Sequence, residues 1–401
     1  MGLGTVVVDL SLQSDVHFGA FGARALQRGE VKNVRKLGLN GPLAYSLLCL
    51  ILIAAGMAGV WWGNKAYGPE MYADNGLLPA VEAFEKGQNY AVFDLNLNIR
   101  KLHELQVSRM TKTPDVVIIG ASHWQEAHSD LLKGMTLYNS HIHRDFWEDL
   151  LGAPYIFAAN NRLPKRMIIS IRDNQFRPIP TRPDYLWEPG IANYRLMADK
   201  IGVEKENYWT TFPYQRIRQL FSISMLFDNL TRWHNADVRP HATTDVRSET
   251  LDTLMPDGSI MWSKAHLAFF SQDRMKREAM ALANLRRNDP PQVEARGVAA
   301  FEKLLDYLKV QGVTVYLAQP PFNPIYYDNL QGSAYFEGLK KIDALTHDIA
   351  ARHALKMIGG FNPHVVGCTP DMYIDAEHSN PICLQKIFDE FAEIVKSEGG
   401  K

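Results

Sequence analysis

Residues Pro114–Trp124, with the sequence PDVVIIGASHW, decide the fold of this chain. The four β-branched apolar residues Val116–Ile119 predict a strand that is buried on both faces, as in a parallel sheet. The glycine and alanine that follow are small enough for a sharp turn, and residues 125–132 have the composition of a helix. We therefore expect Ser122 at a strand-to-helix junction above the carboxyl end of the sheet, where open α/β sheets bind ligands.

Residues Tyr373–Ser379, YIDAEHS, supply a candidate acid and a candidate base near the other end of the chain. Asp375 and His378 are three residues apart in one tight turn, so both side chains can lie on the same side. Asp375 can then accept from one ring nitrogen of His378 while the other nitrogen faces a nucleophile. Ser122 is the candidate nucleophile, and its alternative role is to cap the helix that follows. The hypothesis is a Ser-His-Asp triad.

The order of these residues resembles the SGNH hydrolase superfamily, also called GDSL-type esterases. The resemblance covers roughly Asp115–Lys396, with Ser122 after the first strand and Asp375 and His378 before a last helix at residues 382–396. It implies that Ser122 is the nucleophile and that His378 is first general base and then general acid. It also implies that Asp375 orients His378.

Four more buried strands are expected, at residues 135–138, 166–171, 313–318 and 355–358. Their alternation with helices predicts a three-layer parallel α/β sheet. By the resemblance, this is an SGNH-like, flavodoxin-like domain with an inserted cap region at about residues 178–291. Aromatic residues of the insert either stack on sugar rings or form its own core.

Donors to an oxyanion are a further implication of the resemblance, and here the sequence departs from the family pattern. The family has a glycine N–H after the second strand, where this chain offers Ser140 or His141. The family's asparagine after the third strand is matched by Asn174, although the usual Gly-x-Asn-Asp spelling is absent. Asn174 as an ordinary turn residue is the alternative. His123, beside the nucleophile, is expected to line the cleft.

Histidines and acidic residues near the first strand raise two further questions. Four histidines cluster in sequence and suggest a metal site: His123, His128, His141 and His143. His141 and His143 would share one side of an extended segment, but His123 and His128 are five residues apart, a spacing that does not align side chains on a helix. No ligand set rich in Asp or Glu accompanies them, so we expect no metal, and nothing indicates a cofactor. The charged residues are interpreted as a helix start with a solvated face, and a role in binding substrate near the cleft is the alternative; they are Arg144, Asp145, Glu148 and Asp149.

The composition of the 401-residue chain excludes several classes of protein. Charged residues at 22% and apolar residues at 46% are typical of a folded globular protein. A net charge of −1 offers no electrostatic basis for binding nucleic acid. Three cysteines exclude a dense disulfide scaffold, and the lack of a C-x-x-C pair does not favour zinc.

Residues Leu43–Trp62 form an apolar run within a stretch that has no charge from Leu37 to Asn64. This length spans a bilayer as a helix. A buried core helix and a cleaved signal peptide are the alternatives, but the region before the run is far longer than a usual signal n-region. The predicted divisions are a cytosolic tail at 1–42, an anchor at 43–63, a connector with a helix at 64–110 and the SGNH-like domain at 111–401.

Basic residues flank the apolar run asymmetrically. Only Lys65 follows it closely, whereas Arg24, Arg28, Lys32, Arg35 and Lys36 precede it. The positive-inside rule then places the N-terminus in the cytoplasm and the domain outside, which in a bacterium is the periplasm. We expect a single-pass protein of the inner membrane.

Cys368 and Cys383 bracket the candidate acid and base. An oxidising compartment would permit a disulfide bond between them. Two free buried thiols are favoured, because Cys383 falls at a helix start that faces an apolar run.

The resemblance also implies a function, through membrane-anchored relatives such as alginate and other exopolysaccharide acetylation proteins. Those work beside a membrane-bound O-acyltransferase that exports acetyl groups. The first expectation is therefore O-acetyl transfer to an exported polysaccharide, with such an acyltransferase as partner. A carbohydrate O-acetyl esterase is the second, and a catalytically silent scaffold or binding subunit of a polysaccharide secretion complex is the third.

Overall fold

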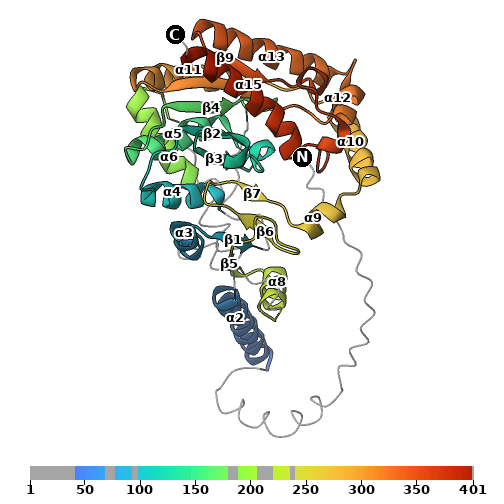
Figure 1. Cartoon of the computed structure of the whole chain (residues 1–401). Coiled ribbons are helices and arrows are strands. Elements are labelled where there is room, and N and C mark those ends of the chain that lie inside the picture. The colour runs from blue at the N-terminus through green and yellow to red at the C-terminus, as the bar shows by residue number, and fades with distance from the viewer. Residues whose placement is uncertain are drawn as a thin grey trace. The chain divides into compact units, whose positions relative to one another are not determined.

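Five parallel strands form the main sheet of the structure, a computed structural model in which residues 41–67, 77–92, 98–143, 145–178, 188–205, 220–234 and 240–399 are described (Figure 1). Every neighbouring pair in this sheet is parallel. Counted along the chain, the spatial order is 2-1-3-4-5, a common order of doubly wound α/β sheets. The predicted parallel sheet is confirmed. In spatial order its strands are β3 (Leu137–Ile142), β2 (Val116–Ala121), β4 (Arg166–Ser170), β8 (Thr314–Gln319) and β9 (Lys356–Gly359).

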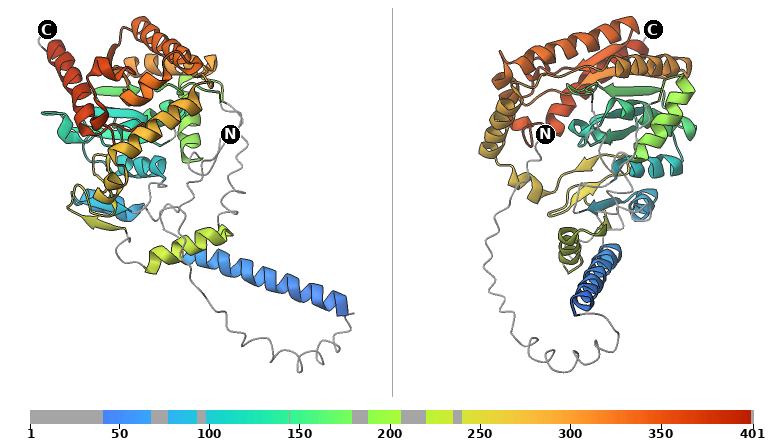
Figure 2. Two further views of the ribbon diagram at one scale, coloured as in Figure 1. Left: turned by 90° about the vertical axis from the view of Figure 1, so that its right-hand side faces the viewer. Right: turned by 180° about the vertical axis from the view of Figure 1, so that it is seen from behind.

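Helices cover both faces of the main sheet, as the views in Figure 2 show. Alternate side chains of β2 point to opposite faces. Val117 and Ile119 pack into one hydrophobic core, and Val116 and Ile118 pack into a second core across the sheet. The strand is buried on both faces, as its β-branched residues predict. The first core is covered by α4 (Ile99–Arg109), α5 (Trp147–Ala159), α6 (Glu188–Ile201) and α11 (Ala295–Val310), and the second by α15 (Pro381–Gly399).

A third core joins the helices that precede and follow β8. Its members include Ala279, Tyr326 and Leu339, which come from three different helices. This core lies beside the strand ends β8 and β9 through Phe322 and Phe361. The three helices are α10 (Gln272–Arg286), α12 (Pro324–Leu330) and α13 (Ala334–Arg352), and the short α14 (Pro363–Val366) follows β9.

A second, antiparallel sheet combines the connector with the inserted region. Its four strands are in the order β5-β1-β6-β7. β1 (Asn89–Val92) follows helix α3 (Leu78–Glu85) and pairs with β5 (His241–Thr243) and β6 (Asp252–Leu254), while β7 (Ile260–Met261) completes the edge. The strands of the insert are therefore joined in one sheet with β1, which comes from residues before the main sheet.

The hairpin between β6 and β7 docks on the edge strand β3 of the main sheet. The backbone N–H of Asn139 donates to the Asp257 carbonyl at 2.6 Å. Gly258 has a φ of +80°, and a Cβ on it would lie 2.3 Å from the Asn139 carbonyl oxygen. Only glycine fits this approach without a shift of backbone. The insert is in this way held against the strand next to β2.

The acidic residues at the start of α5 are buried, so the predicted solvated face is wrong. Asp149 accepts from Arg100 Nε at 2.8 Å and from Arg100 Nη2 at 2.7 Å. Asp145 accepts from Arg172 Nε at 2.6 Å. A buried carboxylate requires such a partner. The sequence pattern misses these pairs because both arginines come from other elements. Arg144 lies outside the described residues.

Helix α2 (Gly41–Tyr67) contains the apolar run. Its segment Leu43–Asn64 is long and apolar enough to cross a membrane. The most apolar residues of this segment are not buried in the structure. The chain divides at Gly63 into two units, Met1–Trp62 and Gly63–Lys401. Residues 1–40 of the predicted cytosolic tail lie outside the described residues.

Candidate active site

Ser122, His378 and Asp375 form one hydrogen-bonded chain in the structure. The Ser122 hydroxyl lies 2.9 Å from His378 Nε2, and His378 Nδ1 lies 2.8 Å from Asp375 Oδ2. The side chains of His378 and Asp375 are 19% and 17% exposed, so solvent reaches the group. This is the arrangement in which a histidine takes the proton of a serine while a carboxylate holds the ring.

Asp375 and His378 lie in a turn whose own backbone N–H groups bind the Asp375 carboxylate. Asp375 Oδ1 accepts from the backbone N–H of Glu377 at 2.8 Å and of His378 at 2.7 Å. The Ile374 N–H donates to the His378 carbonyl at 2.9 Å, and Tyr373 and Ser379 form an antiparallel bridge. An aspartate that accepts from its own turn is a common local motif. The spacing Asp-x-x-His therefore directs both side chains to one side, as predicted.

Electrostatics set the protonation states of this pair. Burial acts to raise the pKa of Asp375, but the neighbouring His378 and hydrogen bonds from the turn outweigh it and lower the pKa to about 2. Burial acts to lower the pKa of His378, but the attraction of Asp375 and its hydrogen bond raise that pKa above its ordinary value. Asp375 is thus a carboxylate at neutral pH, and it makes His378 a stronger base.

Ser122 leaves the carboxyl end of β2 at the switch point between β2 and β4. The predicted helix after it is wrong, because the described chain there has only the short 3₁₀ turns Ser122–Trp124 and Ser129–Leu131. Backbone carbonyls that a helix would use are bound elsewhere: the Gln125 carbonyl accepts from Ile260 N–H at 2.8 Å. Within the described residues, no α-helix therefore begins directly after Ser122.

Asn139 holds the same segment from β3. Its side-chain nitrogen donates to the Trp124 carbonyl at 2.6 Å and to the Ala127 carbonyl at 3.0 Å. The Trp124 ring nitrogen donates to Ser170 Oγ on β4 at 2.7 Å. Two neighbouring strands therefore fix the path of the chain just after Ser122.

Glu126 links this segment to the insert, and sequence reasoning missed it. The Glu126 side chain is 1% exposed, and its Oε1 accepts from Arg247 Nη2 at 3.0 Å and from the Trp262 N–H at 3.0 Å. The Trp262 ring lies edge-on to the His378 ring, with centroids 5.4 Å apart. The insert thus supplies one wall of the site. The only signal in the sequence is a glutamate four residues after the candidate nucleophile.

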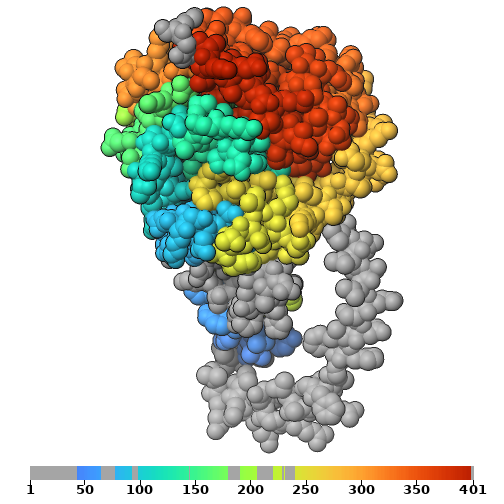
Figure 3. All heavy atoms as spheres, viewed as in Figure 1, coloured from blue at the N-terminus to red at the C-terminus, as the bar shows by residue number. Residues whose placement is uncertain are grey.

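Three segments far apart in sequence meet around the candidate triad. The space-filling view shows residues after β2 in teal, the insert in yellow and the C-terminal segment in red on one face (Figure 3). Gln385 Nε2 of α15 donates to the Leu131 carbonyl at 3.1 Å, which ties the last helix to the segment after Ser122.

His123 is buried beside the candidate base. Its ring centroid lies 5.7 Å from that of His378. Neither ring nitrogen has a hydrogen-bond partner among the described residues. Burial, with repulsion from His378 and Arg172, lowers the pKa of His123 to about 3, so the ring is neutral. The predicted place of His123 next to the nucleophile agrees with this position, and its role in binding stays a prediction.

Ser140 does not lie at the exit of its strand. β3 continues to Ile142, beyond the predicted end at residue 138. In the register of the sheet, Ser140 is paired with Ile119 of β2. The last pair of this register is Ala121 with Ile142, so Ser140 lies two residues before the end of β3, about 7 Å along the strand. An oxyanion role for Ser140 has no support in this register.

Asn174 follows β4, as predicted, but its amide is engaged by neighbours. The amide nitrogen donates to Asp173 Oδ2 at 2.7 Å and lies 3.5 Å from the Tyr335 hydroxyl. The Tyr335 hydroxyl also donates to Asp173 Oδ2. The amide nitrogen carries two N–H groups, and one of them is bound by Asp173. Donation from Asn174 to an oxyanion stays a prediction.

Cys368 and Cys383 form a disulfide, so the favoured interpretation of two free thiols is wrong. Both residues are buried, in a small core with Tyr373. The bridge Tyr373–Ser379 folds the loop back on itself, which brings the two ends of the loop together. The disulfide therefore closes the loop that carries Asp375 and His378.

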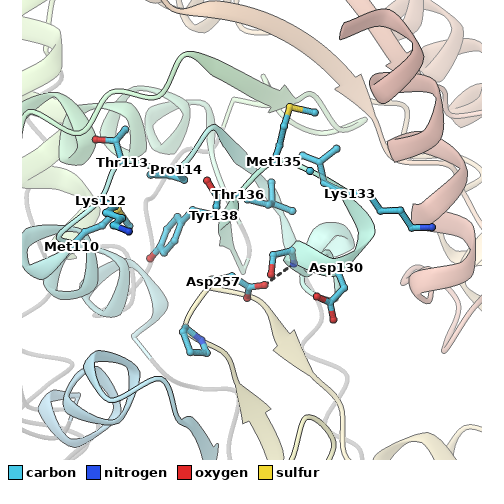
Figure 4. Close-up of a pocket in the computed structure, with 15 residues that line it drawn as sticks. Met110, Lys112, Thr113, Pro114, Asp130, Lys133, Met135, Thr136, Tyr138 and Asp257 are labelled. Carbon is cyan, nitrogen blue, oxygen red and sulfur yellow. Dashed lines mark hydrogen bonds between the residues drawn. The ribbon is translucent and has the colours of Figure 1, made fainter. Parts of the chain in front are cut away.

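No group of three or more His, Cys, Asp or Glu side chains suited to a metal occurs within the described ranges. A cavity of about 690 Å³ opens beside residues Thr113, Pro114, Met135 and Thr136 (Figure 4). These residues precede β2 and β3, so the cavity lies at the amino ends of the strands, away from Ser122.

Comparison of this chain with protein-family models, with curated proteins and with solved structures finds no match. The geometry of the site is therefore the basis for inferring its chemistry.

Proposed function

We propose that this protein performs acyl ester chemistry through Ser122, His378 and Asp375. The observation that carries the proposal is the chain of hydrogen bonds from the Ser122 hydroxyl through His378 to Asp375, at 2.9 and 2.8 Å. The most specific form of the proposal is O-acetyl transfer to an exported polysaccharide.

The first half-reaction would place the acyl group on Ser122. His378 Nε2 takes the hydroxyl proton as Ser122 Oγ bonds to the acyl carbon. The same proton then passes from His378 to the oxygen of the departing alcohol as its bond to the acyl carbon breaks. Asp375 remains ionised and stabilises the protonated ring. The backbone N–H of Ser122 is the proposed donor to the oxyanion.

The second half-reaction decides between transfer and hydrolysis. A sugar hydroxyl or a water molecule attacks the acyl-serine, gives its proton to His378 and releases Ser122. A sugar held in place has a high effective concentration and competes with water. The partial exposure of His378 and Asp375 favours the second candidate function, a carbohydrate O-acetyl esterase, because water reaches the site.

An SGNH-type fold is part of the proposal. It is supported by the 2-1-3-4-5 strand order, by Ser122 at the end of the first strand and by the Asp375–His378 turn just before α15. Two features depart from the family: the exit of β3 carries His143, and the Asn174 amide binds Asp173.

We propose an inner-membrane location, with the N-terminus in the cytoplasm and the domain in the periplasm. Support comes from the apolar segment Leu43–Asn64 and the basic residues before it. The disulfide between Cys368 and Cys383 also suits an oxidising compartment. A membrane-bound O-acyltransferase is the proposed source of acyl groups. A periplasm-dependent reporter should be active when fused after residue 401 and inactive when fused at residue 35, and the opposite pattern would refute this topology.

The chemistry is tested with the full chain in detergent. A fluorophosphonate probe should label the wild type and fail to label Ser122→Ala. Absence of labelling in the wild type would refute the proposed enzyme and favour the third candidate function, a catalytically silent scaffold or binding subunit.

Transfer is tested with an activated acetyl ester and oligosaccharides from several exopolysaccharides. The expected result is slow release of acetate alone and, with a suitable acceptor, a gain of one acetyl group in the mass of the sugar. If no acceptor gains acetyl and acetylated sugars lose it, the esterase is the correct function.

A further inference from the structure

Helix α8 (Ile223–His234) presents large apolar side chains to solvent. Ile223 is 61% exposed and Phe227, one turn later, is 65% exposed. Phe221, just before the helix, is 37% exposed. Within the sequence ISMLFDNLTRWH, Leu226 and Leu230 fall at the same helical spacing as Ile223 and Phe227. The helix is therefore amphipathic, and Ile223 and Phe227 are exposed on its apolar stripe.

The start of α8 is fastened to the carboxyl end of helix α2. Asn64 is 4% exposed, and its side-chain nitrogen donates to the carbonyls of Leu220 and Ser222, each at 2.9 Å. A Cβ added to Gly63 would lie 2.5 Å from the Leu226 side chain, so the two helices touch at this glycine. These contacts hold α8 against the last residues of the apolar segment.

That point of attachment is the end of the candidate membrane span. The span is Leu43–Asn64, so Gly63 and Asn64 are where the chain would leave the hydrocarbon. Trp61 and Trp62 precede them, and tryptophan is enriched where spans meet the headgroups. A helix fixed there would lie at the depth of the membrane–water interface.

We propose that α8 is an interfacial helix that lies on the membrane with Ile223 and Phe227 in the lipid. This inference rests on the proposal that Leu43–Asn64 crosses a membrane. Lipid is the occupant that the contacts favour, because Asn64 and Gly63 hold the stripe at the end of the span, where lipid surrounds the chain. A stripe of this kind buries its apolar face roughly 5–10 Å into the boundary between headgroups and acyl chains.

The consequence is a second attachment of the domain to the membrane. An interfacial helix at the end of the span adds a second segment of the chain that binds lipid. For an enzyme that receives acyl groups from a membrane partner, this second attachment would keep the chain at the membrane surface.

The test uses the full chain in phospholipid vesicles, with a Cys49→Ser background and single cysteines labelled with an environment-sensitive fluorophore. The labelled positions are Ile223→Cys and Phe227→Cys. The matched controls are Ser224→Cys, which is exposed on α8 about 100° around the helix from Ile223, and Val365→Cys, which is 80% exposed on α14. Vesicles with a nitroxide quencher high or low on the acyl chain then report contact with lipid and its depth.

The expected result is blue-shifted emission at 223 and 227 that is quenched by lipid nitroxides, more strongly by the shallow quencher. Labels at 224 and 365 should emit as in water and lose little signal. Water-like emission at 223 and 227 overturns the proposal. Blue-shifted emission that nitroxide lipids do not quench also overturns it, because a second copy or another protein then covers the stripe.

A label on the native Cys49 tests the membrane span independently of the interfacial helix. In the wild type, a label on Cys49 reports the span alone, and it should be quenched most strongly by the deep quencher. Quenching at 49 without quenching at 223 and 227 refutes the interfacial helix and leaves the anchor standing. Quenching at 223 and 227 without quenching at 49 keeps the helix on lipid and refutes the span.

Discussion

The two halves of the candidate site are held in place in different ways. The turn with Asp375 and His378 is held by its own N–H groups, by the bridge between Tyr373 and Ser379 and by a disulfide across its base. The segment with Ser122 has none of the α-helical hydrogen bonds expected of it. Its carbonyls and the Glu126 carboxylate are bound instead by β3 and the insert.

The geometry of the acid–base turn is therefore encoded by nearby residues, whereas the geometry of the Ser122 segment depends on residues far away in sequence. A turn that satisfies its own polar groups keeps its geometry when distant parts of the chain change. A segment whose polar groups bind distant partners changes when any of those partners is lost. Substitutions in the acid–base turn should therefore alter chemistry with little change of fold, whereas substitutions around Ser122 should alter both.

The largest expected effect comes from removing the nucleophile or the base. Ser122→Ala and His378→Ala should each lower turnover of an acyl ester by at least about a thousandfold, with folding retained. The double variant should lose little more, because the two residues act as one unit. Initial rates with an activated acetyl ester measure this. The controls are Ser397→Ala and His347→Ala on exposed positions of α15 and α13, and a fall in their rates would point to a general defect.

Asp375→Asn should have a smaller but still large effect on turnover, because the base remains and loses its partner charge. The charge of Asp375 raises the pKa of His378, and burial acts to lower it. Activity needs neutral His378, so in the wild type it should rise with pH through a midpoint above the ordinary histidine value. In Asp375→Asn that midpoint should move to lower pH. An unchanged or higher midpoint in the pH profile of kcat/KM would contradict the assigned pair.

Glu126→Gln tests the long-range half of the comparison. The amide cannot pair with the Arg247 charge, and a buried group left poorly satisfied costs about 1–3 kcal/mol of the free energy of unfolding. Turnover should fall by about tenfold for each 1.4 kcal/mol lost from the transition state, well short of the triad variants. Thermal unfolding and kcat are the measurements. Glu249→Gln, which removes the exposed partner of Lys264, should leave both near wild type.

Loss of the disulfide should have the smallest effect on turnover. In the chain-entropy model, a bridge that closes a loop of this size contributes about 3 kcal/mol, so Cys368→Ser with Cys383→Ser should unfold at lower temperature. Well below that temperature the rate should stay close to wild type, because Asp375 is held by N–H groups of its own turn. Cys49→Ser is the control for an unrelated cysteine. A rate as low as that of His378→Ala would show that the turn depends on the disulfide.

Much of the fold follows from short-range patterns. The β-branched runs predict all five strands of the main sheet, and β2, β4, β8 and β9 begin within a residue of the expected positions. β3 differs because three residues of its carboxyl half, Asn139 to His141, are polar in sequence yet buried in the structure. The Asn139 side chain binds carbonyls of the segment after Ser122. The pattern of apolar residues in a strand does not reveal such a contact.

The sequence by itself determined the alternation of strands and helices, the apolar segment Leu43–Asn64 and the turn in which Asp375 faces His378. These depend on interactions within a few residues, so spacing and residue type encode them. Tertiary structure alone decided that β1 joins the insert, that Glu126 binds Arg247 and Trp262, and that Cys368 bonds to Cys383. The contacts of β1 and Glu126 join segments that are far apart in sequence, whereas the two cysteines are brought together by the fold of their own loop. No local pattern specifies which distant partner a buried polar group will meet.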